Sequence, residues 1–393
     1  MTTTLEAPSG LEGLVVTTTA IGDVLGDEGW FHYRGFDATE LARHRRLEEV
    51  WHLLLVGHLP DEQELTGFLA RVGEARRSLP VALLEELAAQ PPATDRMAAL
   101  RSAWSRAAMA LACRPWVDLD EGERQQQAIA LSSIGPVLMA AIHRGEVTDL
   151  ADLPDSTSAA LLTLVQGNRP DPAQIAALER YLILTLEHGL NASTFTARTV
   201  ASTGADLGAV LVAALGALSG PLHGGAPSRA LEMLDDIGTL ERAEPWVRAA
   251  LERGERIMGF GHRVYRTEDP RARLLRETAQ EQGGPNVELA LQVEEVVRRL
   301  LREAKPDRVL DVNVEYHAAI VLDAVGLPRS LFTPTFAVAR SIGWMAHALE
   351  QMDANRIVRP SSRYAGPAAP RPVPVPERAR VQAVQAAANT AAP

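Results

Sequence analysis

Residues 259–271 read GFGHRVYRTEDPR, in which His262 follows a glycine and precedes several arginines. Two more histidines have glycine neighbours, His188 in HGLNASTF and His223 in GPLHGGA. A glycine beside a histidine lets the backbone and a ligand approach closely, because glycine has no Cβ. One such histidine is weak evidence for a site. Three in separate segments, away from any clean apolar stripe, favour a ligand-binding site.

Arginines near these histidines suggest the kind of ligand. Arg271 ends the first segment, Arg340 lies in AVARSIGW, and Arg359 lies in RPSSRY. A planar guanidinium can grip a carboxylate through two parallel hydrogen bonds, so several converging arginines would select a dicarboxylate. Taken singly, each is better explained as a surface arginine. Arg266 could meet a phosphate of a nucleotide-like ligand. The chain has no Walker loop and no GxGxxG fingerprint, so such a ligand would have to be held by irregular loops and scattered arginines.

Other histidines, and the cysteine, are better explained by structural roles than by a function. His52, His58, His317 and His347 lie on helical patterns, where a structural histidine is the simpler interpretation. No HExxH motif, paired cysteine set or EF-hand loop is present, so we expect no metal. Cys113 is the only cysteine, which excludes an intrachain disulfide and indicates a buried, inert thiol.

Composition excludes further classes of protein. The chain has 393 residues and a formal net charge of −11, from 39 basic and 50 acidic residues. An acidic protein is a poor candidate for nucleic-acid or anionic-membrane binding. No signal-peptide pattern and no apolar stretch long enough to cross a bilayer is visible. With 46% hydrophobic residues the chain can build a large core. We therefore expect a cytoplasmic protein with one large or two linked domains.

Sheet is expected only near the N-terminus. Val15–Thr19 reads VVTTT and is predicted to be a strand. Ile21–Val24 and Trp30–Tyr33 flank GDEG and predict a short hairpin. From Asp37 the pattern turns helical, and Asp37 with Glu40 fits a capping box.

Helical periodicity covers most of the remaining chain, which makes the class mostly α. The segment 205–219 is apolar on nearly all sides and should be a buried helix. Other helices are expected at about 47–54, 62–78, 97–112, 124–143, 172–188, 228–235, 244–253, 269–282, 286–303, 315–325 and 334–351.

Segments in one order along the chain resemble bacterial citrate synthases. They include HGLNASTFTARTVAST, LSGPLHGGAPSRALEML, IMGFGHRVYRTEDPRA, LFTPTFAVARSIGWMAHALEQ and NRIVRPSSRYAGP. The similarity runs from about residue 10 to 367, with a weaker middle around 60–170. That family is an all-α homodimer in which a smaller domain closes over the substrates. The resemblance implies a citrate-synthase-like two-domain helical fold with a short N-terminal β-hairpin.

Carried onto this chain, the resemblance divides it into five parts. These are a disordered N-terminus (1–10), the first part of a large domain (11–225), a small domain (226–326), the second part of the large domain (327–366) and a Pro/Ala-rich tail (367–393).

The resemblance also implies an activity, the condensation of acetyl-CoA with oxaloacetate and water to give citrate and CoA. The CoA thioester is a substrate, so no cofactor is expected. The active site lies between the domains and is shared between subunits. Oxaloacetate would be held by His188, Arg271, Arg340 and Arg359, with Arg359 donated by the partner subunit.

The remaining roles concern catalysis and CoA. His223 would donate a hydrogen bond to the thioester oxygen while a carboxylate takes the α-proton. His262 would polarise the ketone of oxaloacetate and supply a proton to the new alkoxide. Arg266 would contact a CoA phosphate.

One departure from the family concerns the base. The family has an aspartate in a segment reading NVD, whereas this chain reads NVEYHAAIVLDAVGLP and has Glu315 there. Glutamate has similar basicity, but its extra methylene moves the carboxylate by roughly 1–1.5 Å, and a 1 Å misplacement can cost about a hundredfold in rate. A smaller departure is Pro227, where the family usually has Asn.

Several functions remain open at this stage. The site could be re-spaced around Glu315 and fully active. It could instead prefer propionyl-CoA, as in 2-methylcitrate synthase, since one methyl changes binding by only about 1–3 kcal/mol. The protein could also be a catalytically weakened binding protein, or cleave citryl-CoA without net synthesis.

Overall fold

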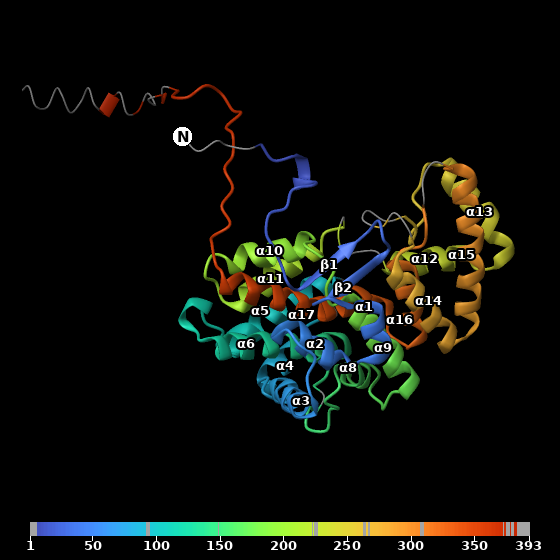
Figure 1. The fold of residues 1–393 in the computed structure, drawn as a ribbon, viewed down its shortest axis with the longest axis horizontal. Helices are drawn as coiled ribbons and strands as arrows, with labels where there is room; N and C mark the ends of the chain where they lie inside the picture. Colours follow the sequence, from blue (N-terminus) through green and yellow to red (C-terminus); the bar gives the residue numbers. More distant parts are fainter. Residues whose placement is uncertain are drawn as a thin grey trace, which may run out of the picture. The chain divides into compact units, whose positions relative to one another are not determined.

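The structure is a computed structural model. It describes residues 6–91, 95–147, 149–221, 223, 227–261, 265, 268–306, 310–371, 373–374, 378 and 381–382. The chain forms two compact units, Met1–Ile357 and Val358–Pro393. In its described part the first unit is mostly helical, with one small sheet (Figure 1).

The sheet is an antiparallel meander of β1 (Gly22–Leu25), β2 (Trp30–Tyr33) and β3 (Phe36–Asp37). Gly22 pairs with Tyr33 and Leu25 with Trp30, so GDEG forms the turn and the predicted hairpin is confirmed. The Tyr33 hydroxyl donates a hydrogen bond to the Ile183 carbonyl oxygen at 2.9 Å, which joins the sheet to the helical core.

The strand predicted at Val15–Thr19 does not form, and that prediction was wrong. The segment is not part of the sheet, and Val15 is 83% exposed. β-Branched residues favour a strand only where a neighbouring strand supplies the hydrogen bonds and a packed face. The described residues supply neither of these along this segment.

The helices alternate with short connections along the chain. In order they are η1 (Ser9–Leu11), α1 (Ala38–His44), α2 (Leu47–Val56), α3 (Glu62–Arg77), α4 (Val81–Ala88), α5 (Arg96–Ala110), η2 (Trp116–Asp118), α6 (Glu121–Ser133), α7 (Gly135–Arg144), α8 (Thr157–Gln166), α9 (Pro172–Thr185), α10 (Ala192–Ala201), α11 (Leu207–Leu218), α12 (Pro227–Ile237), α13 (Leu240–Glu252), α14 (Pro270–Gln282), α15 (Pro285–Ala304), α16 (Val314–Ala324), η3 (Arg329–Leu331) and α17 (Phe332–Asp353).

Most predicted helices are confirmed to within a few residues. The Asp37 side chain caps α1 by accepting from the backbone N–H groups of Thr39 and Glu40. The helix predicted at 124–143 is two helices, α6 and α7, with a break at Ile134 and Pro136 in the first turn of α7. Helices α4, α8 and α10 were not predicted.

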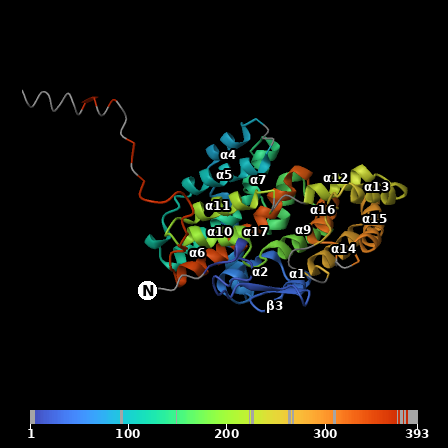
Figure 2. The same cartoon turned by 90° about the horizontal axis from the view of Figure 1, so that it is seen from above.

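Helix α17 lies at the centre of the core. It packs against α2, α6, α9, α10 and α11 (Figure 2). Helix α11 is buried on one side only, because Ala209 and Gly216 are exposed. The predicted helix at 205–219 is confirmed and is buried along one side, while the described part of the single chain leaves an apolar face of α11 open.

Helices α12 to α15 lie together at one end of the first unit (Figures 1 and 2). Helix α14 packs against α9 and α16, and α13 packs against α15. An ion pair between Arg180 on α9 and Glu281 on α14 at 2.5 Å joins this group to the neighbouring helices. The division into domains at 226 and 326 stays a prediction. None of the described helices is both long and apolar enough to cross a membrane.

Candidate active site

The first element of the site is a buried ion pair at the start of α14. Asp269 is the N-cap of α14, and its side chain accepts a hydrogen bond from the Arg271 backbone N–H at 3.0 Å. The Arg271 side chain donates to both oxygens of the same carboxylate, from Nε at 3.0 Å and from Nη2 at 2.8 Å. Burial opposes the charge on Arg271, but Asp269 outweighs it and raises the pKa of the guanidinium. Arg271 therefore stays charged and is held in one orientation.

Glu315 lies beside this pair, in the first turn of α16. The second Asp269 oxygen accepts the Val314 backbone N–H at 3.2 Å, so the starts of α14 and α16 are joined. The Oε2 atom of Glu315 is enclosed and has no hydrogen-bond partner in the described part of the chain. Burial raises the pKa of Glu315 to about 7, with Asp269 adding to the rise and Arg271 and Arg340 opposing it. A carboxylate with this pKa can both take and release a proton near neutral pH.

Arg340 contributes a second buried guanidinium from the middle of α17. It is 3% exposed, and its Nε donates to the Thr185 carbonyl oxygen at 2.8 Å. The guanidinium lies over the ring of Phe336, 4.7 Å from its centroid. Burial lowers the pKa of Arg340, and the nearby Glu187 opposes this. A buried cation held mainly by neutral groups is costly alone, so the site favours an anionic ligand.

His188 and Tyr265 link the segment after α9 to the start of α14. The His188 Nε2 atom lies 3.1 Å from the Tyr265 hydroxyl oxygen, and the two rings meet edge to face. The Arg271 guanidinium lies 5.8 Å from the centroid of the Tyr265 ring. Tyr265 therefore contacts a histidine that follows α9 and an arginine at the start of α14.

His223 is held at the start of α10 in a defined tautomer. The Ser193 backbone N–H donates to His223 Nε2 at 3.3 Å, and Ser193 Oγ lies 2.9 Å from the same nitrogen. Because a backbone N–H can only donate, Nε2 must carry a lone pair and Nδ1 the proton. Burial lowers the pKa of His223, and the charge of Arg340 lowers it further. His223 is therefore neutral and presents Nδ1–H as a donor.

Ser193 is itself fixed by its neighbours. Its backbone N–H also lies 3.2 Å from Oδ1 of Asn191, the N-cap of α10. The indole N–H of Trp344 on α17 donates to Ser193 Oγ at 3.1 Å. The orientation of His223 thus depends on α10 and α17 together.

A chain of buried polar side chains leads to Glu187, the residue before His188. Arg198 Nη1 lies 3.0 Å from Nδ1 of His347, and His347 Nε2 lies 3.0 Å from a carboxylate oxygen of Glu187. Arginine has only donors, so His347 accepts at Nδ1 and donates Nε2–H to Glu187. Glu187 directly precedes His188 in the chain. His347 thus has the structural role expected from the sequence, and so does His317, which is buried 3.1 Å from Glu294.

Asn313 joins the start of α16 to the segment that precedes His262. Its Oδ1 caps α16 by accepting the Glu315 backbone N–H at 3.0 Å, and its Nδ2 donates to the Gly261 carbonyl oxygen at 2.9 Å. The Gly261 N–H donates to the Asp311 carbonyl oxygen at 2.7 Å, and Phe260 and Val312 form an isolated β-bridge. The backbone that leads to Glu315 and the backbone that leads to His262 are therefore held as one piece.

The sequence-based site residues fall into three groups. His262 and Arg266 lie outside the described residues. Arg359 belongs to the second unit and is exposed. The members brought together by the contacts and charges above are His188, His223, Arg271, Glu315 and Arg340.

Sequence reasoning missed the residues that orient this group. Asp269, Asn191 and Asn313 are helix N-caps, and each occurs as Asp or Asn directly before a helical pattern, a signal that could have been read. Ser193 and Trp344 have no such signal, because their partners come from distant segments.

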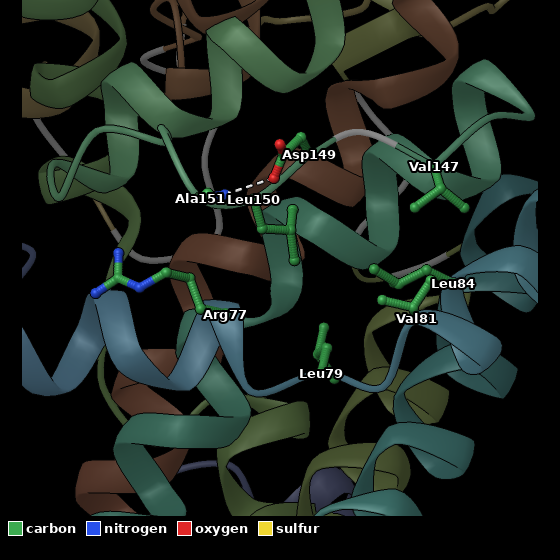
Figure 3. A pocket seen from close by; sticks show the side chains of 8 residues that line it. All are labelled: Arg77, Leu79, Val81, Leu84, Val147, Asp149, Leu150 and Ala151. Carbon is green, nitrogen blue, oxygen red and sulfur yellow. Dashed lines mark hydrogen bonds between the residues drawn. The ribbon is translucent and has the colours of Figure 1, made fainter.

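A cavity elsewhere in the first unit does not have the chemistry of a dicarboxylate site. It has a volume of about 340 Å³ and is lined mostly by aliphatic side chains (Figure 3). Asp149 accepts the Ala151 backbone N–H at 2.9 Å, and the Arg77 guanidinium lies at the edge. With one cation and one carboxylate, this cavity lacks the converging cations that a dicarboxylate requires.

Comparison with known proteins agrees with the fold. A family model described as "Citrate synthase, C-terminal domain" matches residues 10–361. Citrate synthase 2 of Bacillus subtilis is 36% identical over 386 residues, covering 95% of this chain and 100% of the relative. The crystal structure of citrate synthase from Pyrobaculum aerophilum has a TM-score of 0.83 at 33% identity, covering 94% of this chain and 96% of that one.

A further solved structure contains ligands. It is citrate synthase from the thermophilic archaeon Thermoplasma acidophilum in a ternary complex with carboxymethyl coenzyme A and oxaloacetate. Its TM-score is 0.84 at 28% identity, and the match covers 94% of this chain and 99% of that one. The predicted mostly α, citrate-synthase-like fold is confirmed. The chain belongs to the citrate synthase family.

Proposed function

We propose that this chain is a cytoplasmic acyltransferase that condenses acetyl-CoA with oxaloacetate and water to give citrate and CoA. The observation that carries the proposal is Glu315, a desolvated carboxylate with a pKa of about 7 near two buried arginines. Arginines suit the two carboxylates of oxaloacetate, and a carboxylate of this basicity suits removal of a proton from the thioester methyl group. The relative from Thermoplasma acidophilum binds oxaloacetate and a CoA analogue.

The proposed mechanism begins with the enolate. Glu315 takes a proton from the methyl group of acetyl-CoA while His223 donates Nδ1–H to the thioester oxygen, where negative charge develops. Arg271, Arg340 and His188 hold oxaloacetate, with Arg359 supplied by the partner subunit. The enolate carbon attacks the ketone carbon.

The later steps need a second acid. His262 polarises the ketone and gives its proton to the new alkoxide, forming citryl-CoA. Water then cleaves the thioester and releases CoA and citrate. Arg266 is proposed to contact a CoA phosphate.

The glutamate at the base position is compatible with this mechanism. Glu315 occupies the first turn of α16, where Asn313 caps the helix and Asp269 accepts the preceding backbone N–H. Its carboxylate is desolvated and affected by both arginines, as a working base requires. These contacts favour a site re-spaced around glutamate over a weakened binding protein.

We also propose a homodimer. Ala209, Val212 and Gly216 form an open apolar face on α11, and Met109 on the neighbouring α5 is 80% exposed. A cavity of about 460 Å³ lies between these helices and includes Cys113 in its lining. A second copy covering this face would remove apolar surface from water.

The first test is CoA thiol release measured with a disulfide dye, using oxaloacetate with acetyl-CoA and, separately, with propionyl-CoA. We expect release that depends on oxaloacetate and a larger kcat/KM with acetyl-CoA. A larger kcat/KM with propionyl-CoA would make 2-methylcitrate synthase the function. No release from a folded protein that still gains thermal stability with CoA or oxaloacetate would favour the binding protein.

Asn313→Ala is expected to lower kcat by about a hundredfold, because it releases both Glu315 and the segment before His262 from their shared anchor. KM for oxaloacetate should change less, since Arg271 and Arg340 do not depend on Asn313. The measurement is steady-state kinetics with a thermal melt for each variant.

Two further variants test whether Asn313 acts by positioning Glu315 and the segment before His262. Asn313→Ser keeps an acceptor for the helix cap but cannot reproduce the bond to Gly261, and it should recover stability more than rate. Asn355→Ala removes a comparable bond, from Nδ2 to the Ser202 carbonyl oxygen at 3.1 Å, and serves as the control. Equal kcat in Asn313→Ala and Asn355→Ala would contradict the assignment.

A further inference from the structure

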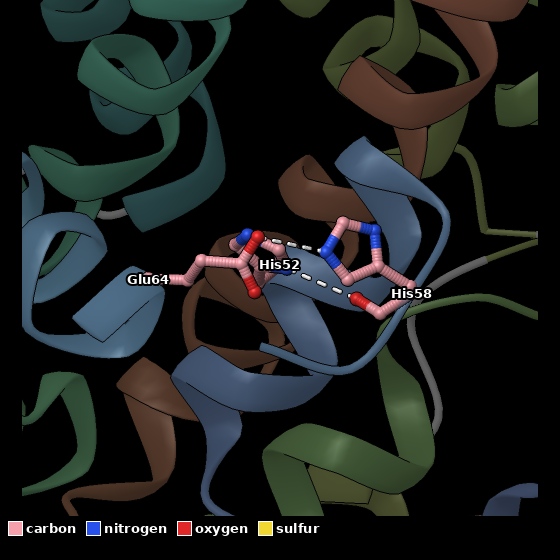
Figure 4. A group of neighbouring side chains, drawn as sticks. All are labelled: His52, His58 and Glu64. Atoms are coloured by element: carbon pink, nitrogen blue, oxygen red, sulfur yellow. Dashed lines mark hydrogen bonds and ion pairs between the residues drawn. The ribbon is translucent and has the colours of Figure 1, made fainter. Parts of the chain in front are cut away.

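A second cluster of chemically active side chains lies on α2 and α3, where the sequence indicated only structural histidines. His52 on α2, His58 in the turn and Glu64 on α3 point toward one another (Figure 4). One possible ligand atom from each lies within 4.8 Å of the other two. It is the only group of three such residues in the described part of the chain.

His52 is oriented as a ligand would be. It is 4% exposed, and its Nδ1 lies 3.0 Å from the His58 carbonyl oxygen. A carbonyl can only accept, so Nδ1 carries the proton and Nε2 keeps a lone pair. Histidines that bind metals commonly donate their other ring N–H to a carbonyl in this way, which fixes the ring and the tautomer.

Glu64 is also held in place. One of its oxygens accepts the Asp61 backbone N–H at 2.9 Å, as part of the capping box of α3, and the other lies 3.0 Å from His58 Nε2. A glutamate side chain is ordinarily a charged carboxylate at neutral pH. Two imidazoles and a charged carboxylate therefore meet where α2, the following turn and the start of α3 come together.

We propose that His52, His58 and Glu64 bind a first-row divalent metal ion, preferentially Zn²⁺, with water as the fourth ligand. Two imidazole nitrogens and one carboxylate oxygen form a recognised zinc donor set, with bonds of about 2.0–2.2 Å. A tetrahedral site then needs ligand atoms roughly 3.3 Å apart. The exposed side chains of His58 and Glu64 can close this difference by small rotations, while His52 stays fixed.

Metal binding takes the place of the hydrogen bond between His58 Nε2 and the Glu64 carboxylate. It fastens the end of α2 to the start of α3, which adds a local crosslink. The residues belong to none of the elements that carry the proposed substrate contacts, so this inference is independent of the proposed function.

The test uses the full chain without an affinity tag. Zn²⁺ is titrated by calorimetry, and Co²⁺ is titrated as a spectroscopic probe of tetrahedral coordination. We expect one bound ion per chain and visible Co²⁺ bands that Zn²⁺ displaces. Both His58→Ala and Glu64→Gln should weaken binding by at least about tenfold. The side chains of His58 and Glu64 are 54% and 40% exposed, so the fold should survive both changes.

The matched control is His44→Ala. His44 Nε2 lies 3.5 Å from a Glu40 carboxylate oxygen, a comparable exposed pair to which the described residues add no third ligand. This variant should bind as the unchanged chain does. Zn²⁺ should raise the Tm of the unchanged chain and of His44→Ala, but not of His58→Ala. The proposal is overturned if no ion binds, or if His58→Ala and Glu64→Gln bind as tightly as His44→Ala.

Discussion

Glu315→Gln lowers kcat for citrate formation by about 10²–10⁴-fold, the range for loss of a positioned general base. The amide keeps the size of the side chain and its place in the first turn of α16, but it cannot take the α-proton. KM for oxaloacetate should change little, because Arg271 and Arg340 remain. The measurement is CoA thiol release over a range of both substrates.

The stability of the same variant provides an internal control. Glu315 has its pKa raised from 4.5 to about 7, so the folded state binds its proton more tightly than the unfolded state. Its contribution to stability is present below pH 4.5 and is lost as the pH rises through about 7. Glu315→Gln removes that loss and should raise the Tm at pH 8. If Glu315→Gln has a higher Tm at pH 8 and is nearly inactive, the Glu315 carboxylate serves catalysis and not stability.

The pH profile of kcat/KM checks the same assignment in the unchanged enzyme. Activity should rise with pH and reach half of this rise near pH 7, as Glu315 ionises. Glu315→Asp should keep a carboxylate base and a measurable rate. Full activity in Glu315→Gln would remove Glu315 from the mechanism, whatever the profile of the unchanged enzyme.

His223→Ala lowers kcat by about 10²–10³-fold, the cost of removing one donor to a developing oxyanion. The structure places the proton on Nδ1, because the Ser193 backbone N–H occupies Nε2. Loss of this donor affects the enolate more than bound acetyl-CoA, so kcat should fall more than KM rises. Steady-state kinetics with acetyl-CoA measure the two separately.

Ser193→Ala tests the tautomer behind this prediction. The backbone N–H of residue 193 remains, so Nε2 still accepts and Nδ1 still donates, and the loss of rate should be smaller than in His223→Ala. His44→Ala removes an exposed histidine and should leave the rate unchanged. A Ser193→Ala enzyme as slow as His223→Ala would show that the hydroxyl, not the backbone, sets the tautomer.

The parts of the fold that could be predicted are those determined by residues close together in the sequence. The hairpin around GDEG, the cap at Asp37 and most helices depend on neighbours in the chain, and the structure confirms them. Ordered motifs also predicted the family, which the comparisons show, whereas the roles of the site residues stay predictions. The failure at Val15–Thr19 involves a surface that another segment would have to contribute, because none of the described segments supplies a partner strand there. The exposure of Ala209 and Gly216 on α11 likewise depends on distant segments.

The sequence by itself determined which chemical groups this protein has and the fold that carries them. Only the tertiary structure decided the pKa, tautomer and orientation of these groups. Burial among α14, α16 and α17 raises the pKa of Glu315, and the start of α10 assigns the proton of His223 to Nδ1. The same holds for His52 and Glu64, which became candidate ligands once a turn brought them together. Desolvation and hydrogen-bond partners depend on distances between side chains, and folding alone sets those distances.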